Sequence, residues 1–141
     1  MRNNKAKRHD ELLKREIEKA TSKFSQHLMS NSKWVRLIDK LVENTDKVFK
    51  IIFKKVQKDQ LGELYLDEDT TFEFDYWQNG FEGHNSLGGC LGFNEIEFLV
   101  FPKFVDNKKQ DIIYIEELIK SIGQYPLDID ENRLKLSCYK V

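Results

Sequence analysis

The sequence predicts an α+β fold, with a mainly antiparallel sheet of about five strands, N-terminal helices and one helix before the last strand. Three observations predict it. Apolar residues recur at helical spacing in the first third of the chain, they alternate with polar residues later, and Gly, Asn and Asp separate these segments. The 141 residues suit one domain, 1–141, in which residues 1–29 form an N-terminal helical extension.

Three helices are expected from the apolar spacing. The first runs from His9 to about Leu28 with one apolar stripe, formed by Leu13, Ile17, Ala20, Phe24 and Leu28. The Ser30-Asn31-Ser32 cluster breaks it and supplies an N-cap for a second helix, which carries Trp34, Leu37, Ile38, Leu41 and Val42. Asp111 can cap a third helix that ends at Gly123, with a core face formed by Ile112, Ile115, Leu118 and Ile122.

The strands are expected in the centre and at the end of the chain. Residues 48–56 fit either a helix or a strand, and their β-branched and aromatic content favours a strand. A short strand over 63–66 and a clear alternating strand over 71–77 follow. In the next strand, 95–101, we expect Ile96, Phe98 and Val100 inside and Glu95 and Glu97 outside. Residues 133–139 alternate again, with three inward positions, Leu134, Leu136 and Cys138.

A long loop is expected between the two central strands. Residues 78–94 hold five of the seven glycines of the chain. Loops of this length and composition are more often functional or mobile than minimal connections. The glycines match no phosphate-binding motif, so we expect them to permit positive φ at tight turns.

The charges are unevenly distributed along the chain. No Lys or Arg lies between Lys58 and Lys103, and this interval holds ten acidic residues, whereas the remainder holds 23 basic and 14 acidic residues. Two interpretations stay open. The basic flanks fold back and neutralise the centre, or the centre forms an acidic surface that steers a basic partner. Such a surface would not bind nucleic acid, because phosphates need Lys and Arg.

The sequence predicts a soluble cytoplasmic protein. Cys90 and Cys138 belong to no closely spaced Cys/His set, which fits two reduced cysteines in a core. The basic residues at the N-terminus are not followed by an apolar run, so no signal peptide is expected. No apolar stretch is long enough to cross a membrane, and no cofactor motif is present, so neither a membrane nor a cofactor is expected.

No residue is assigned to catalysis or to a metal. His84 has Asp75 and Glu82 near it in sequence, but a loop histidine satisfied locally is the commoner situation. If their strands paired, four carboxylates would crowd one face, namely Glu73, Asp75, Glu95 and Glu97. A nuclease centre of that kind would need a lysine two residues after its glutamate, and Glu97 and Leu99 occupy those positions.

A surface for protein recognition is the remaining possibility. Trp77 falls on the acidic side of its strand and precedes Gly80-Phe81, and aromatic residues beside acidic ones are typical of interface hot spots. We therefore predict a partner-binding set formed by Glu73, Asp75, Trp77, Glu82 and His84. The alternative is that the N-terminal helices cover this face.

Three short motifs resemble those of an uncharacterised family of small bacterial proteins. They are Asn31-Ser32-Lys33-Trp34, the Glu95–Phe98 strand leading to Phe101-Pro102-Lys103, and Ile122-Gly123-Gln124-Tyr125. In the family, a tryptophan follows Ile-Glu, and Phe98 takes its place here. The similarity covers roughly residues 30–141 and implies no activity. By size and charge the chain is also similar to the immunity proteins of bacterial toxin systems.

The sequence favours a binding role over an enzymatic one. The leading hypothesis is a non-catalytic protein-binding module whose acidic stretch, from Asp59 to Glu97, occludes a basic partner such as a toxin. The rival is a metal-dependent enzyme that uses the carboxylate cluster, with His84 as ligand or base. A third reading is a structural subunit of a homodimer.

Overall fold

The computed structural model describes residues 4–67, 73–74, 79–82 and 85–141. Its main sheet has five strands in the order β10-β11-β7-β2-β3, and every neighbouring pair is antiparallel. The strands are β10 (Leu127–Ile129), β11 (Arg133–Ser137), β7 (Ile96–Pro102), β2 (Ile51–Lys55) and β3 (Leu61–Leu64). The predicted α+β fold is confirmed, and the ambiguous segment 48–56 contains a strand.

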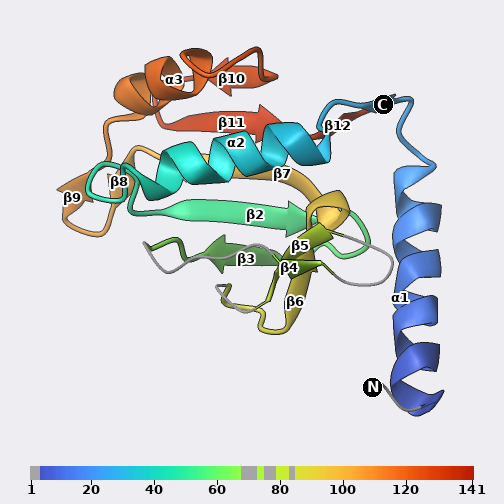
Figure 1. The fold of residues 1–141 in the computed structure, drawn as a ribbon. Coiled ribbons are helices and arrows are strands. Elements are labelled where there is room, and N and C mark those ends of the chain that lie inside the picture. Colours follow the sequence, from blue (N-terminus) through green and yellow to red (C-terminus); the bar gives the residue numbers. More distant parts are fainter. Residues whose placement is uncertain (1–3, 68–72, 75–78, 83–84) are drawn as a thin grey trace.

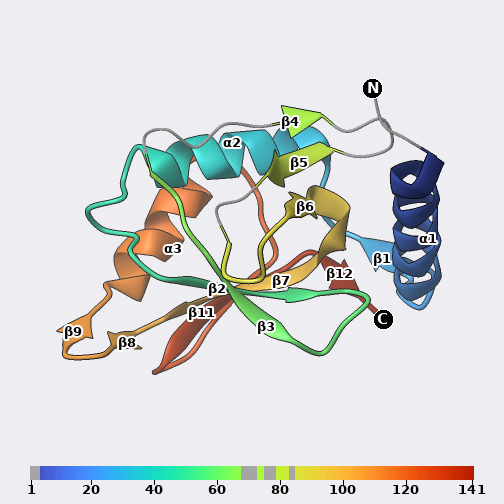
Figure 2. The ribbon, with the colours of Figure 1, turned by 90° about the horizontal axis from the view of Figure 1, so that it is seen from below.

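Helices α2 (Asn31–Val42) and α3 (Ile112–Lys120) lie side by side on one face of this sheet (Figures 1 and 2). The predicted caps are present, since Ser30 Oγ accepts a hydrogen bond from Lys33 N and Asp111 Oδ1 accepts one from Tyr114 N. Both caps satisfy helix N–H groups that have no partner within the helix. Between helices and sheet lies one apolar core, which includes Trp34, Leu37, Phe53, Ile115, Leu134 and Leu136.

Helix α1 (Asn4–Thr21) ends earlier than the sequence pattern predicts. The hydroxyl groups of Thr21 and Ser22 donate to the carbonyls of Glu18 and Lys19, which closes the last turn. The chain then forms β1 (Gln26–His27), which pairs with β12 (Tyr139–Lys140) near the C-terminus. In both views α1 stands at one end of the molecule (Figures 1 and 2).

The predicted orientation of strand β7 is wrong beyond its first residue. Opposite β2, Lys54 pairs with Phe98 and Lys55 pairs with Ile96, so the register shifts by one residue at Glu97. This extra residue is a β-bulge, and it reverses the alternation of the side chains that follow. Ile96 and Val100 are buried as predicted, but Leu99 and Phe101 belong to the core cluster where the sequence pattern placed Phe98.

The expected loop 78–94 contains two strands, and they join a strand within the predicted segment 71–77, of which 71–72 and 75–77 lie outside the described residues. Strands β4 (Glu73–Phe74), β5 (Asn79–Glu82) and β6 (Cys90–Gly92) form a separate three-stranded antiparallel sheet. A 3-10 turn, η1 (Phe93–Glu95), joins β6 to β7. The sequence pattern did not predict the strands within 78–94, because glycine weakens a strand signal. Gly80 is needed there, since a Cβ at that position would overlap the carbonyl oxygen of Leu91 on β6.

A short hairpin lies at the end of the molecule opposite α1 (Figures 1 and 2). Its strands are β8 (Phe104–Val105) and β9 (Lys108–Lys109), which pair antiparallel. No helix in the described part of the chain combines the length and the apolar character that a membrane crossing requires.

Candidate protein-binding site

Lysines of β2 lie against several residues of the acidic stretch. Lys54 Nζ is 2.8 Å from Glu97 Oε1 on β7 and 3.9 Å from Asp59 Oδ1 in the turn after β2. Lys50, just before β2, lies 4.0 Å from Glu63 on β3. These pairs are set by the order of strands in the sheet, with β2 between β3 and β7. Part of the acidic stretch is therefore neutralised within the fold, as one of the two interpretations expects.

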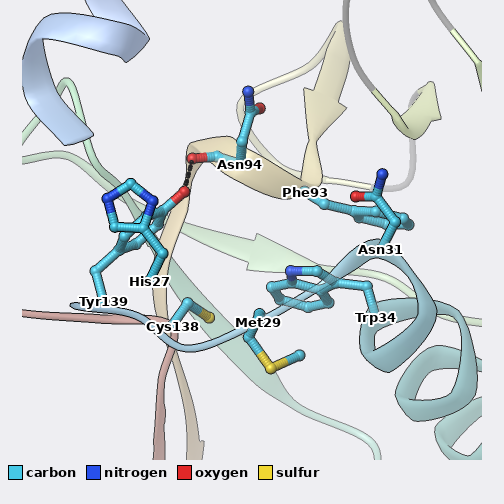
Figure 3. Close-up of a pocket in the computed structure, with 8 residues that line it drawn as sticks. All are labelled: His27, Met29, Asn31, Trp34, Phe93, Asn94, Cys138 and Tyr139. Carbon is cyan, nitrogen blue, oxygen red and sulfur yellow. Dashed lines mark hydrogen bonds between the residues drawn. The ribbon is translucent and has the colours of Figure 1, made fainter. Parts of the chain in front are cut away.

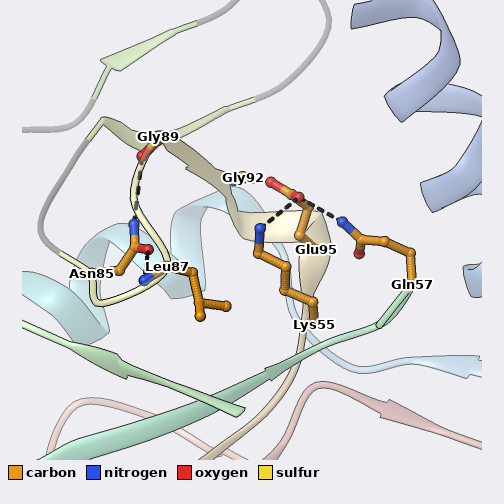
Figure 4. A network of polar contacts seen from close by, with 7 residues as sticks. All are labelled: Lys55, Gln57, Asn85, Leu87, Gly89, Gly92 and Glu95. Carbon is orange, nitrogen blue, oxygen red and sulfur yellow. Dashed lines mark hydrogen bonds and ion pairs between the residues drawn. The ribbon is translucent and has the colours of Figure 1, made fainter. Parts of the chain in front are cut away.

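Glu95 is fully buried, which corrects the prediction that it faces outward. Its Oε2 accepts a hydrogen bond of 2.6 Å from Gly92 N, and its Oε1 accepts one of 2.8 Å from Gln57 Nε2 (Figure 4). Lys55 Nζ lies 3.9 Å away, with its side chain 13% exposed. A buried carboxylate is tolerated only when it is paired and hydrogen-bonded, and this one meets both conditions. Glu95 therefore fastens η1 to the end of β2.

A second polar contact orders the turn before β6. The buried Asn85 accepts a hydrogen bond of 3.0 Å from Leu87 N through Oδ1, and its Nδ2 lies 3.5 Å from the Gly89 carbonyl (Figure 4). Asn85 also forms an isolated bridge with Leu64 of β3. The three-stranded sheet is thus connected to the edge of the main sheet.

The five residues of the predicted partner-binding set are placed by the structure only in part. Glu73 belongs to β4, opposite Gly80, and Glu82 belongs to β5, opposite Cys90. The side chains of these two glutamates lie outside what the structure describes, as do Asp75, Trp77 and His84. The backbone pairing brings the β4 and β5 ends of this set into one small sheet.

The four-carboxylate cluster suggested by the sequence required the strands that carry these residues to pair, and they do not. Strands β4 and β7 belong to different sheets, so Glu73 and Glu97 are not cross-strand neighbours. Glu95 and Glu97 each have a lysine from β2 as partner. Among the described residues, no group of three or more His, Cys, Asp or Glu side chains is arranged to hold a metal ion.

A small pocket of about 190 Å³ lies where β1, α2, η1 and the C-terminal segment meet (Figure 3). Trp34 and Phe93 stack on one side, with ring centroids 5.4 Å apart, and His27 meets Tyr139 edge to face on the other. The remaining lining residues are Met29, Asn31, Asn94 and Cys138. The volume is below the range of about 300–1,000 Å³ that is usual for small-molecule sites.

The pocket also lacks an activated nucleophile. Burial raises the pKa of the Cys138 thiol well above its ordinary value, and the Glu97 carboxylate raises it further. Burial also raises the pKa of Tyr139 to about 12, and its hydroxyl donates to the Asn94 carbonyl at 2.7 Å. Both groups stay protonated at neutral pH, so Cys138 is a core residue and not a catalytic thiolate.

The fold and these contacts define an α+β protein in which the described polar side chains fasten structural elements to one another. The chain matches no protein-family model, and comparison with curated proteins and with solved structures found no similar protein. The resemblance to a family of small bacterial proteins therefore stays a prediction.

Sequence reasoning missed the residues that neutralise the acidic stretch. Glu97 and Lys54 are 43 positions apart, and Glu95 and Gln57 are 38 apart. No local pattern links such pairs, because they follow from strand order and register. The nearest signal was the adjacent pair Lys54-Lys55 in a predicted strand, which must place one lysine on each face.

Proposed function

We propose that this chain is a non-catalytic protein-binding module whose acidic region, from Asp59 to Glu97, binds a basic partner protein. Within that region the proposal centres on the acidic segment 67–82 and the loop residue that follows it, and the proposed contact residues are Glu73, Asp75, Trp77, Glu82 and His84. An immunity-type inhibitor that occludes a basic toxin is a protein of this class. Complementary charge would give fast association that slows as salt is added.

The observation that carries the proposal is that lysines in and just before β2 pair with acidic residues near the two ends of the acidic region. Asp59, Glu63, Glu95 and Glu97 lie within 4.0 Å of a lysine from this strand or its N-terminal flank. All four lie outside residues 67–82. That segment holds six acidic residues and neither Lys nor Arg. The described carboxylate partners of these lysines therefore lie outside 67–82. Asp67 has a contact within the protein, and the sequence charge of the rest of the segment supports a role in attracting a cation-rich surface.

Two of the proposed contact residues, Glu73 and Glu82, lie on paired strands of the described backbone. Strand β5 pairs with both β4 and β6, and the close contact of Gly80 with β6 leaves no room for a side chain there. A site held by a paired scaffold loses less conformational entropy on binding than a free loop does. Residues 67–82 also carry five aromatic residues, a type enriched at interface hot spots.

Capture of partners from a native cell lysate at low and high salt tests this function. The bait is the full chain, compared with the Glu73→Lys/Glu82→Lys variant. We expect the wild-type chain to retain a basic protein that high salt releases, and the variant to lose it. A matched control, Glu117→Lys/Asp128→Lys, makes the same change in net charge at two exposed positions outside the acidic region.

Two results would contradict the proposal. The first is equal capture by the wild-type chain and the Glu73→Lys/Glu82→Lys variant. The second is stoichiometric binding of Mg²⁺, Mn²⁺ or Zn²⁺ in calorimetry that this variant abolishes, because it would favour the metal-dependent enzyme. Circular dichroism of each variant establishes that it is folded.

A further inference from the structure

The β8–β9 hairpin presents an exposed aromatic side chain between two lysines. Phe104 is 56% exposed. Lys103 Nζ lies 5.6 Å from the centroid of its ring and Lys109 Nζ lies 5.8 Å from it. Both distances are within the range of cation–π attraction, so each lysine carries its positive charge next to the exposed ring.

The hairpin is fixed to the main sheet at its base. Gln110 is 1% exposed, and its Oε1 accepts hydrogen bonds from Phe49 N and Lys50 N at 2.8 and 3.0 Å. Its Nε2 donates to the carbonyls of Lys50 and Pro102 at 3.1 and 3.0 Å. One buried side chain therefore connects the hairpin to β2 and β7. Phe104 is presented on a rigid support, which lowers the entropic cost of binding.

A groove of about 750 Å³ lies between this hairpin, the start of α3 and the turn from β10 to β11. Its apolar lining is formed by Ile112, Ile113 and Ile129, and Ile113 is 63% exposed. Lys103 and Lys109 stand on the hairpin side. Phe104 is not part of this lining but belongs to the hairpin that borders the groove, so exposed Ile113 in the groove and exposed Phe104 on the hairpin offer apolar surface to a partner.

The charges at the groove differ in how far they are already paired. Asp111 accepts from Tyr114 N, Asp130 pairs with Arg133 at 3.5 Å, and Glu116 pairs with Lys120 at 3.6 Å. In contrast, neither Lys103 nor Lys109 forms an ion pair with a described residue, and of the acidic lining residues Glu131 alone has no described ion pair or hydrogen bond to its carboxylate. The hairpin side of the groove therefore presents unneutralised positive charge beside an apolar floor.

We propose that this groove binds an extended segment of a partner protein that contains an apolar residue next to an acidic one. The apolar side chain would rest on Ile113 and Ile129 beside Phe104. The carboxylate would pair with Lys103 or Lys109, neither of which forms an ion pair with a described residue. This surface is separate from the acidic region and prefers the opposite charge, so the inference does not rest on the proposed function.

Selection of random peptides displayed on phage against the immobilised full chain tests the proposal. Peptides are kept only if they fail to bind the Lys103→Glu/Lys109→Glu variant. We expect the selected peptides to carry Asp or Glu next to Leu, Ile or Phe, and to bind the variant at least tenfold more weakly in fluorescence anisotropy. Their binding should shift the amide signals of residues 103–113 and 129–131. Selected peptides without acidic residues, or no peptide that discriminates, would overturn it.

The controls separate this surface from others. Lys58→Glu/Lys140→Glu makes the same charge change at exposed lysines elsewhere and should bind the peptides like the wild-type chain. Phe104→Ala keeps the lysines and should weaken binding through its apolar part, which keeps the proposal testable if the double variant fails to fold. Glu73→Lys/Glu82→Lys should bind the peptides normally. Self-association of the chain in sedimentation that Phe104→Ala abolishes would identify a second copy as the occupant and overturn a partner segment.

Discussion

The lysines in and just before β2 and the lysines in and just before the β8–β9 hairpin have opposite electrostatic surroundings. Lys50, Lys54 and Lys55 each lie within 4.0 Å of a carboxylate from a residue of the acidic stretch. Lys103 and Lys109 lie over the ring of Phe104 and form no ion pair with a described residue. Both groups flank the acidic stretch in sequence. The difference shows that the order of the strands, and not proximity along the chain, decides which lysines are neutralised by a carboxylate.

Some of these charged side chains hold the fold together, whereas others remain available to a partner protein. A pair such as Lys55 and the buried Glu95 holds two elements together, and its removal would damage the fold. The hairpin lysines hold no described element in place, so their charge remains available for an incoming carboxylate.

The largest effect is expected from Glu95→Ala. The change leaves the Gln57 amide, Gly92 N–H and a nearly buried Lys55 without their acceptor. Breaking a buried ion pair from one side costs about 3–5 kcal/mol. Urea unfolding followed by circular dichroism should show a loss of this size. Asp59→Ala, which removes a fully exposed partner of Lys54, is the control and should leave the free energy of unfolding unchanged. A loss below about 1 kcal/mol for Glu95→Ala would contradict a structural role for this carboxylate.

Gln110→Ala should have the next largest effect, because Gln110 connects the two regions. It removes four hydrogen bonds at a buried position, and we expect a loss of about 2–3 kcal/mol. Hydrogen exchange at the amides of Phe49 and Lys50 should become faster. Gln60→Ala, at an exposed glutamine, serves as the matched control. Unchanged protection at both amides would show that the hairpin is held by other contacts.

The pH dependence of the free energy of unfolding at alkaline pH tests the surroundings of Cys138. Burial raises the pKa of this thiol, and the Glu97 carboxylate raises it further. Above a pKa of about 9 the unfolded thiol loses its proton while the folded thiol keeps it. The unfolded state then binds fewer protons, so the free energy of unfolding falls as pH rises, by up to about 1.4 kcal/mol per pH unit. Urea unfolding between pH 8.5 and 10 should show a shallower fall for Cys138→Ala, each protein being referred to its own value at pH 7. Equal slopes would mean that the folded thiol titrates normally.

The smallest effect is expected from Lys109→Glu, which introduces an acidic partner beside Lys103. Relief of the repulsion at an exposed site should raise the free energy of unfolding by less than about 1 kcal/mol. The gain should vanish in 1 M salt. Lys140→Glu, at an exposed lysine of β12, should give no gain. A loss of stability in Lys109→Glu would show that the lost contact with the Phe104 ring outweighs any new pairing with Lys103.

Much of the fold could be predicted from the sequence, because its signals are local. The caps Ser30 and Asp111 and the inward residues of β11 follow from neighbouring residues alone. The orientation of β7 could not be predicted, since the bulge at Glu97 depends on how β7 pairs with β2. Strands β5 and β6 were missed because glycine weakens a strand signal, and the close contact of Gly80 with Leu91 exists only in the folded chain.

The candidate sites could be predicted less well. The absence of Lys and Arg between Lys58 and Lys103 could be seen in the sequence. Which carboxylates of this interval pair with a lysine could not, because Lys54 and Glu97 meet only through the order of the strands. The acidic set from Glu73 to His84 stays a prediction. The hairpin groove gave no motif at all, since its residues come from β8–β9, α3 and the β10–β11 turn.

The central claim is that the charge of residues 67–82 attracts the basic partner. The most direct test is the association rate constant of the captured partner as a function of salt, measured by stopped flow. The account predicts that Glu73→Lys/Glu82→Lys lowers the rate constant at low salt by at least about tenfold, and that Glu117→Lys/Asp128→Lys lowers it by less than about twofold. Equal reductions in the two variants would mean that net charge alone governs association, and would contradict a site at 67–82.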